Sequence, residues 1–330
     1  MGIKNTAISL LVIMAFFTTL LIGRQKVEAR GDISVVSYIL SNNKLSNEAI
    51  VEDTSQADFE KLMYEHLIEY KQQKNEYKQQ KIKDNLQEQF KLEDLEKEIK
   101  SYLGSNVNKL GLIYYDINSK KSIEINADNQ FAAASTVKVP INMLMYDMIQ
   151  EEKIDINEKL EFQEGDFEEG AGVLQGEKLS KPIAIKTLSD YSIRYSDNIA
   201  INMLLRKVGN ENRYNFIETI VGHPILHEGN DITPRDSFKI LERLYLNPED
   251  NEYYPTLIET MKKTVFHDRI DKYIPEEIVA HKIGDYGPYV NDIGIVFKEN
   301  PYIFVIFTKN VPEAHEIIGQ VSKIIYDNQK

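Results

Sequence analysis

The chain has 330 residues, of which 42% are hydrophobic and 28% are charged, the composition of an ordinary globular protein. Its net charge of −13 argues against a nucleic-acid partner, because binding to phosphates requires a basic face. The sequence contains no cysteine, which excludes disulfides, thiolate nucleophiles and zinc–sulfur sites.

The first 29 residues have the pattern of an export signal. Lys4 precedes an apolar run from Ala7 to Ile22, and Val27 and Ala29 have the small-residue spacing of a cleavage site. An uncleaved membrane anchor is the alternative, although the apolar run is slightly short for a membrane span. We therefore expect residues 1–29 to be a signal peptide, or else an N-terminal anchor. We expect an exported protein, either secreted or held at the outer face of the cell membrane or wall.

The next segment, residues 30–91, predicts a polar linker followed by a helical spacer. Arg30 to about Ser55 is polar and lacks sustained periodicity. Phe59 to about Gln89 has no glycine or proline and is rich in Glu, Lys and Gln, which favours a solvated helix. A hexapeptide in this helix recurs once after seven residues, which is too little to predict a coiled coil. Such a spacer would hold the following domain away from a membrane or wall.

A packed domain is predicted over residues 92–330. It opens with apolar residues at helical spacing, which Gly104 ends. These residues are Leu92, Leu95, Ile99 and Leu103. A strand hairpin is expected at 110–116 and 122–126, mainly helices over 134–247, strands at 278–283, 292–298 and 302–308, and a closing helix at 313–326. This order predicts a mixed α/β domain whose sheet combines strands from both ends of the chain.

The first candidate for chemistry is the pair Ser135 and Lys138. Residues three apart share a helix face, so the hydroxyl and the amine can meet. A lysine whose pKa is lowered by burial can remove the proton of a serine, and the apolar neighbours supply that burial. At a helix N-terminus the N–H of Ser135 would also be free to bind an oxyanion. Alone, this spacing is common and carries little weight.

Two further groups follow along the chain. In the first, Ser196 offers a hydroxyl to relay a proton to a leaving group, and Asn198 offers an amide to hold the substrate's acyl side chain. Asp197 between them is more plausibly a turn residue. Taken alone, this group could equally be an ordinary helix N-cap.

The second of these groups lies on a late strand. Lys282 would place a cation over the cleft, lowering the pKa of Lys138 and attracting an anionic substrate group. Gly284 would let a ligand approach the backbone closely, and the N–H of Asp285 would be the second oxyanion donor. The alternative is a strand-end lysine beside a turn glycine.

The order and spacing of the three groups are far more specific than any one of them. Ser-x-x-Lys, then Ser-Asp-Asn roughly sixty residues later, then Lys-x-Gly on a late strand resemble the class A β-lactamase family of penicillin-recognising serine enzymes. The resemblance covers about residue 92 to the C-terminus. It implies a β-lactamase/DD-peptidase-like α/β fold, with an antiparallel five-stranded sheet flanked by helices and an all-helical subdomain.

The resemblance also implies roles for individual residues. Ser135 would be the acylated nucleophile and Lys138 its activator. Ser196 and Asn198 would form the second group, and Lys282 with Gly284 the third. We expect a monomer that needs no cofactor and no metal.

Three features depart from the family pattern. Lys282 follows Ser196 by fewer residues than in those enzymes, so the loop between them at 220–233 is shortened and lacks the glutamate that activates the deacylating water. Glu228 could replace it, although a solvated carboxylate is the simpler interpretation. Ile283 stands where the family has a hydroxyl residue, and residues 290–294 lack an arginine that many members have. Both missing groups help to hold the carboxylate of a β-lactam.

Other candidate sites are weaker. His223 and His227 are four residues apart, but Pro224 argues against a helical metal pair. The acidic stretch from Glu164 to Glu169 would border the cleft by resemblance, where one carboxylate could act as a base; a solvated charge run is the alternative.

The predicted function is that of a serine hydrolase acting through an acyl-enzyme at Ser135, which opens a β-lactam or a related cyclic amide or ester. One alternative is a D-alanyl-D-alanine peptidase or transferase acting on peptidoglycan stems. The other is a slow-turnover module that binds or senses penicillin or wall fragments. The missing glutamate favours the alternatives over efficient destruction of antibiotics.

Overall fold

The computed structural model describes residues 56–227 and 229–329. The chain divides into two units, residues 1–88 and 89–330. The predicted signal peptide, the linker up to residue 55 and Glu228 lie outside the described residues, and the predicted domain boundaries at 29 and 91 stay predictions. Among residues that are described, no helix is both long and apolar enough to cross a membrane.

Helix α3 (Gln56–Leu103) joins the two helical segments expected from the sequence. The described side chains from residue 71 to 84 are all exposed, in keeping with a solvated helix. Over its last turns the helix instead buries Leu95, Ile99 and Leu103 in the core of the second unit. The 3.6-residue period of apolar positions that predicted this helix therefore marks its packed face.

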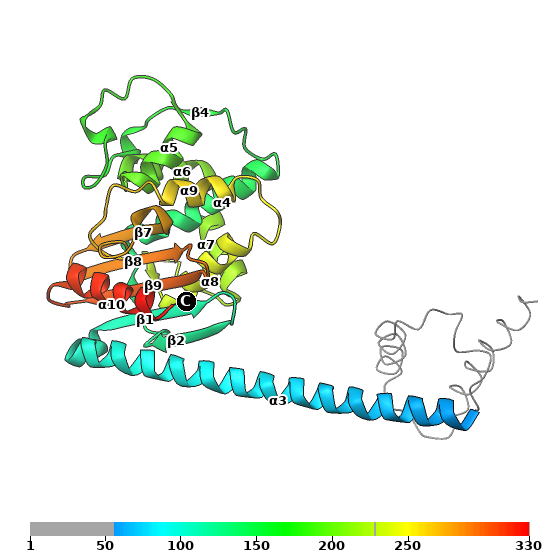
Figure 1. Cartoon of the computed structure of the whole chain (residues 1–330). Coiled ribbons are helices and arrows are strands. Elements are labelled where there is room, and N and C mark those ends of the chain that lie inside the picture. The colour runs from blue at the N-terminus through cyan, green and yellow to red at the C-terminus, as the bar shows by residue number, and fades with distance from the viewer. Residues whose placement is uncertain (1–55, 228, 330) are drawn as a thin grey trace, which may run out of the picture. The chain divides into compact units, whose positions relative to one another are not determined.

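The second unit is built on one five-stranded sheet with the order β2-β1-β9-β8-β7, in which all neighbours are antiparallel (Figure 1). The strands are β1 (Leu110–Asp116), β2 (Lys121–Ile125), β7 (Val279–Tyr286), β8 (Tyr289–Val296) and β9 (Tyr302–Lys309). The hairpin from the beginning of the domain thus pairs with the last strand of the chain, for example Leu112 with Ile306. The prediction that the sheet combines strands from both ends is confirmed.

Strands β7 and β8 are longer at their shared end than the sequence suggested. Lys282 to Asp285 all pair with β8, and the hairpin closes at Gly287, whose φ of 54° suits a tight turn. Because β7 is an edge strand, its second side is open to the segment that carries Ser135.

Each face of the sheet has its own core. One face packs against the end of α3 and against α10 (Ala314–Asn328), which lies along the sheet in Figure 1. The other face packs against the helical region. Its helices are α4 (Lys138–Gln150), α5 (Ile185–Arg194), α6 (Asn198–Val208), α7 (Asn210–Val221), α8 (Pro234–Leu246) and α9 (Tyr254–Met261).

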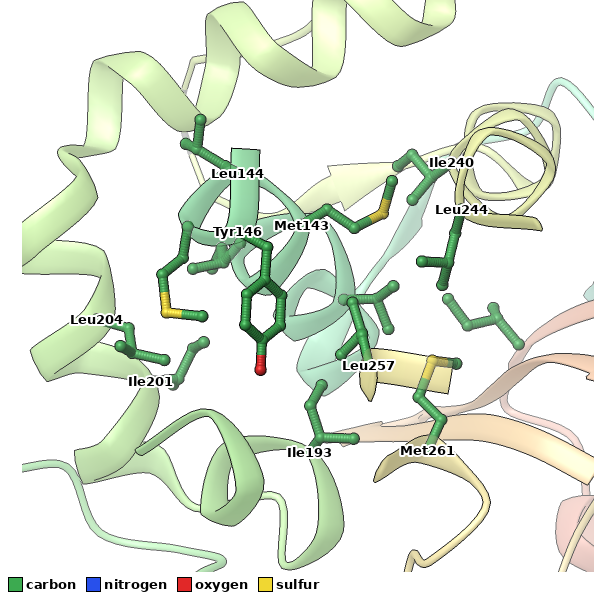
Figure 2. Close-up of a cluster of buried hydrophobic side chains, with 14 of the residues drawn as sticks. Met143, Leu144, Tyr146, Ile193, Ile201, Leu204, Ile240, Leu244, Leu257 and Met261 are labelled. Carbon is green, nitrogen blue, oxygen red and sulfur yellow. The ribbon is translucent and has the colours of Figure 1, made fainter. Parts of the chain in front are cut away.

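Helix α4 is the centre of the helical region. Nearly every side chain from Lys138 to Tyr146 is buried, which agrees with its apolar sequence on all sides. Figure 2 shows Met143, Leu144 and Tyr146 of α4 surrounded by side chains of α5, α6, α8 and α9. The segment that carries Ser135 is therefore continuous with a helix that is buried from Lys138 to Tyr146.

Two short strand pairs were not predicted from the sequence. Strand β3 (Phe131–Ala132) pairs with β6 (Asp231–Ile232), and β4 (Lys159–Leu160) pairs with β5 (Ile183–Ala184). Two residues give no detectable period, so such strands are defined by their long-range partners. The β3–β6 pair matters for the site because it holds the shortened loop beside the Ser135 segment.

Candidate active site

Ser135 lies in a single 3-10 turn (Ala134–Val137) that leads directly into α4 at Lys138. A 3-10 turn has three residues per turn, so positions three apart eclipse and Ser135 lies above Lys138. Ala134 has a φ of 51°, a left-handed conformation that is unfavourable for a residue with a side chain. Strain of this kind is concentrated at sites where a side chain must be held in a particular direction.

The sheet fixes the position of this turn. On β8 the buried Asn291 donates from Nδ2 to the carbonyl of Ala132 at 2.8 Å. On β7 a Cβ added to Gly284 would lie 2.7 Å from the carbonyl oxygen of Ala133 and 3.1 Å from the nitrogen of Ser135. Gly284 therefore permits close approach, but the group that approaches is the chain's own Ser135 turn. Sequence reasoning missed Asn291, although an amide inside an apolar strand is a visible sign of a buried polar contact.

Lys138 is buried and makes three hydrogen bonds. Its Nζ donates to the carbonyl oxygen of Ser196 at 2.5 Å, to Ser196 Oγ at 3.2 Å and to Asn198 Oδ1 at 2.8 Å. Burial lowers the pKa of Lys138 to about 8, although the carboxylates of Glu168 and Asp197 act in the opposite direction. A lysine with this pKa has a substantial neutral fraction near neutrality and can accept a proton.

Lys282 approaches the same hydroxyl from the sheet side. Its Nζ lies 2.9 Å from Ser196 Oγ, so this hydroxyl has a lysine on each side. Lys282 is fully buried, and burial together with the charge of Lys138 lowers its pKa well below the usual value. Burial, and not the charge of Lys282, is the main cause of the lowered pKa of Lys138. Ser196 itself has a left-handed φ of 54°.

Asp197 and Asn198 hold the loop at residues 169–174 by hydrogen bonds. Asp197 caps α6 by accepting from Ala200 N at 2.9 Å, and its other oxygen accepts from the N–H groups of Val173 and Leu174 at 2.7 and 2.8 Å. Asn198 donates to the carbonyl of Glu169 at 3.1 Å. The turn-fixing role expected for Asp197 agrees with these contacts. Asn198 is the amide that links Lys138 to the loop.

The acidic stretch at 164–169 contains carboxylates of different kinds. Asp166 is buried and accepts two hydrogen bonds from Arg206 at 2.8 and 2.9 Å, so it anchors the loop. Glu168 is exposed and accepts from Asn202 at 2.9 Å. Glu168 is also the carboxylate whose charge acts most strongly on Lys138.

The shortened loop runs from the end of α7 to β6 at residue 231 and is held by α7. The carboxylate of Glu218 accepts from Ile225 N and pairs with His227, each at 2.9 Å. Arg213 donates to Asn230 at 2.7 Å, and the carbonyl of Asn230 accepts from Ala133 N at 2.8 Å. The loop therefore contacts the Ser135 segment through its backbone. The carboxylate of Glu218 on α7 is occupied by its hydrogen bonds to the loop.

The remaining predicted residues lie along β7. Ile283 is buried in the position where the family has a hydroxyl. Asp285 lies half-exposed near the end of the strand, and its carboxylate accepts from Arg269 at 2.6 Å. Arg269 is almost completely buried and also donates to the carbonyl of Asn291 at 2.8 Å. No local sequence pattern singles out this arginine, because it precedes the strand and reaches it only through the tertiary fold.

Of the predicted residues, the structure brings together Lys138, Ser196, Asn198 and Lys282 by hydrogen bonds. Ser135 adjoins them through the turn, but its Oγ is not hydrogen-bonded to any described residue. Catalytic hydrogen bonds are often long in ligand-free enzymes and shorten when substrate binds. A partly exposed serine beside two buried lysines whose pKa values are lowered is suited to nucleophilic attack on an acyl group.

The fold and the arrangement of these groups define a serine hydrolase of the β-lactamase-like class. The model of the β-lactamase enzyme family matches residues 94–329, so the chain belongs to this family. The sequence-based prediction of the family and of the fold is confirmed. The enzyme class predicted from the sequence is confirmed with it.

The curated relatives of the chain are β-lactamases. β-Lactamase VEB-1 of Pseudomonas aeruginosa is 23% identical over 269 residues, covering 71% of this chain and 90% of that protein. β-Lactamase 3 of Bacillus cereus is 26% identical over 249 residues, covering 67% and 77%.

Two solved structures illustrate the range of the fold. PBP-A is 26% identical with a TM-score of 0.64, covering 72% of this chain and 96% of PBP-A. The TLA-3 extended-spectrum β-lactamase has the same TM-score and covers 72% and 98%, at 21% identity. The latter likeness demonstrates the fold alone.

Proposed function

We propose that this enzyme forms an acyl-enzyme at Ser135 with penicillins and related acyl compounds, and that it releases the acyl group slowly. The observation that carries the proposal is the placement of Ser196 Oγ between Lys138 and Lys282 beside the Ser135 turn. Ser196 Oγ thereby links the two lysines, and Ser135 joins this path when its Oγ approaches Lys138 in the substrate complex.

In the proposed acylation step, Ser135 Oγ attacks the carbonyl carbon of the substrate and its proton passes to neutral Lys138. The N–H groups of Ser135 and Asp285 hold the oxyanion. The bond from the carbonyl carbon to the leaving nitrogen then breaks. That nitrogen takes a proton through Ser196, which Lys138 and Lys282 resupply.

Slow release follows from the groups that could activate water. Glu218 on α7, a partly exposed carboxylate, accepts hydrogen bonds from Ile225 and His227 of the shortened loop and is occupied by them. Glu168 is the carboxylate whose charge acts most strongly on Lys138, but it is exposed and accepts a hydrogen bond from Asn202. Because neither carboxylate is free to activate water, both features favour acylation over rapid hydrolysis.

The relatives support acylation but do not distinguish slow from rapid release of the acyl group. A variant of PBP-A was solved as an acyl-enzyme complex with penicillin G, and PBP-A is 26% identical to this chain. The curated relatives are β-lactamases at similar identity. Similarity therefore supports acylation in general and leaves the rate of release to be measured.

Intact-mass analysis with penicillin G tests the proposal. We expect a single adduct with the mass of the whole penicillin, because ring opening expels no fragment, and we expect it to persist for minutes or longer. Ser135→Ala should give no adduct, whereas the exposed-serine control Ser119→Ala should give the wild-type result. Rapid return to the free mass would contradict slow release. The acyl-enzyme itself is ruled out if neither penicillin G nor a reactive acyl ester labels the protein.

A peptidase or transferase acting on peptidoglycan stems is the second candidate. It is favoured by Ile283 and by the lack of an arginine at 290–294, because both weaken the binding of a β-lactam carboxylate. Release of D-alanine from a stem peptide ending in D-alanyl-D-alanine would distinguish it from a penicillin-binding sensor. For either activity we propose a location outside the cytoplasm, on the basis of residues 1–29, and a monomeric enzyme.

A further inference from the structure

A second cluster of polar side chains lies behind strand β7. It consists of His267, Asp271 and His281, whose nitrogen and oxygen ligand atoms all lie within 4.8 Å of one another. His281 precedes Lys282 in β7, and successive side chains of a strand point to opposite faces. The cluster is therefore separated from the Ser135 site by the strand itself, and the proposed acylation does not use it.

Two buried atoms of this cluster lack hydrogen-bond partners. They are His281 Nε2 and Asp271 Oδ1, and both residues are at least nine-tenths buried. A buried polar atom without a hydrogen bond is costly, so such atoms indicate that a partner is missing. His281 Nε2 lies 3.3 Å from the other oxygen of Asp271, Oδ2, at ion-pair distance, so a metal ion would replace that contact.

The spacing of the cluster is close to that of a tetrahedral metal site. With bonds of roughly 2.0–2.1 Å, the ligand atoms of such a site are about 3.3–3.4 Å apart. His281 Nε2 lies 3.3 Å from Asp271 Oδ2, which matches. Glu276 is outside the group of atoms that lie within 4.8 Å of one another, but its Oε2 is 3.4 Å from His267 Nδ1 and its side chain is 65% exposed, so it has to rotate to reach the same point. The contact from His267 Nδ1 to Asp271 Oδ2, at 2.5 Å, has to lengthen. The His267 side chain is 39% exposed and has room to move.

A carboxylate on β8 orients the buried histidine. His281 Nδ1 lies 2.9 and 3.0 Å from the two oxygens of Asp292, so this nitrogen donates and Nε2 is directed at Asp271. Asp292 is itself held by the N–H of Ile270 at 3.1 Å. A carboxylate that binds the second nitrogen of a metal-bound histidine is the usual outer support of zinc sites.

We propose that His267, Asp271 and His281 bind a divalent transition-metal ion of the Zn²⁺ type, with Glu276 as the fourth ligand. Two imidazoles and two carboxylates suit Zn²⁺, whereas Ca²⁺ and Mg²⁺ prefer oxygen ligands alone. The ion connects the segment at 267–276 to the middle of β7. It stabilises the strand that carries Lys282 and Gly284 without entering the cleft.

This site has no pattern in the sequence. No metal was expected from the sequence, in which only His223 and His227 are close enough in the chain to suggest a pair. His267 and Asp271 lie in an irregular segment, and His281 reaches them from a strand. The three side chains come together only because the segment before β7 packs against that strand in the folded chain.

The test is calorimetric titration of the metal-free full-length protein with Zn²⁺, followed by thermal unfolding. We expect one ion per chain and a rise in Tm of roughly 5–10 °C at a hundredfold excess over Kd. Co²⁺ should give the strong visible absorption of a tetrahedral complex, and Mg²⁺ and Ca²⁺ should leave Tm unchanged.

The variants His267→Ala and Glu276→Gln remove partly exposed ligands, so they should fold, and each should weaken Zn²⁺ binding at least tenfold. The matched control is His227→Ala. Its side chain is 38% exposed and is also paired with two carboxylates, at 2.9 and 3.7 Å, yet it lies outside the cluster. Wild-type binding by the control and weakened binding by His267→Ala support the site. Binding that survives His267→Ala, binding lost in the control, or no binding below millimolar Zn²⁺ overturns it.

Discussion

At the scale of single residues, the proposed mechanism makes the acylation rate depend on the pKa of Lys138. Burial lowers that pKa to about 8, and only the neutral amine can accept the proton of Ser135. The acylation rate should therefore rise about tenfold per pH unit well below pH 8 and level off above it. The measurement is the rate of labelling by a fluorescent penicillin between pH 6 and 9.5.

Arginine at the same position supplies the control for this prediction. Arg stays protonated at every accessible pH. Lys138→Arg should therefore lower the labelling rate by at least about a hundredfold and remove its pH dependence. A wild-type rate that did not vary between pH 6 and 8 would show that another group is the base.

Gly284 gives a second test at this scale. A methyl group there would lie 2.7 Å from the carbonyl oxygen of Ala133, so the Ser135 turn has to shift. We expect Gly284→Ala to slow acylation by at least about tenfold and to cost roughly 1–3 kcal/mol of stability, as overpacking does. Gly176→Ala is the control, because nothing lies within 4 Å of its added Cβ. Equal rates and equal unfolding midpoints for the two variants would contradict the close contact.

At the scale of elements, one aspartate joins helix α6 to the loop at residues 173–174, which precedes α5 in the chain. Asp197 is completely buried and accepts from Ala200 N, Val173 N and Leu174 N. Asp197→Ala removes a helix cap worth about 1 kcal/mol and leaves buried N–H groups unpaired at about 1–3 kcal/mol. We expect a loss of roughly 2–4 kcal/mol in urea unfolding.

The control for this prediction is a surface aspartate on the neighbouring helix. Asp190 forms an ion pair with Arg194 at 3.1 Å, with both side chains about one-third exposed. Asp190→Ala should cost less than about 0.5 kcal/mol, because exposed pairs of this kind contribute little. Similar losses for the two variants would show that the Asp197 contacts do not hold the loop.

The elements that the sequence predicted are those with a repeating pattern. Leu95, Ile99 and Leu103 revealed a packed helix because their spacing is a property of the sequence alone. The same holds for the apolar strands of the sheet. Three ordered groups of polar residues also predicted Lys138, Ser196 and Lys282, which the folded chain brings together, and Ser135, whose role stays a prediction.

What the sequence did not predict is set by contacts between distant segments. Asn291 reaches the Ser135 segment and Arg269 reaches Asp285, and neither contact leaves a local pattern. The two-residue strand β3 exists only because β6 lies beside it. Positioning residues of this kind become visible only when the chain has folded.

At the scale of the whole molecule, the sheet makes the two ends of the second unit depend on each other. Strand β1 near its beginning pairs over its full length with residues 302–308 of β9 near its end. All the side chains of β9 from Tyr302 to Thr308 are buried. Long-range pairing of this kind slows folding, because a long loop must close before the contacts form. The end of α3 completes the core over the same strands.

Two truncated proteins test separately the exposed part of helix α3 and its buried last turns. A protein that begins at Gln89 keeps Leu95, Ile99 and Leu103, so its Tm and its rate of penicillin labelling should match those of the full chain. A protein that begins at Gly104 loses three buried side chains, worth on the order of 6 kcal/mol or more. That loss is comparable with the total stability of about 5–15 kcal/mol for a domain, so it should unfold near room temperature. Circular dichroism and labelling on both proteins check this, and a stable, active protein starting at Gly104 would contradict it.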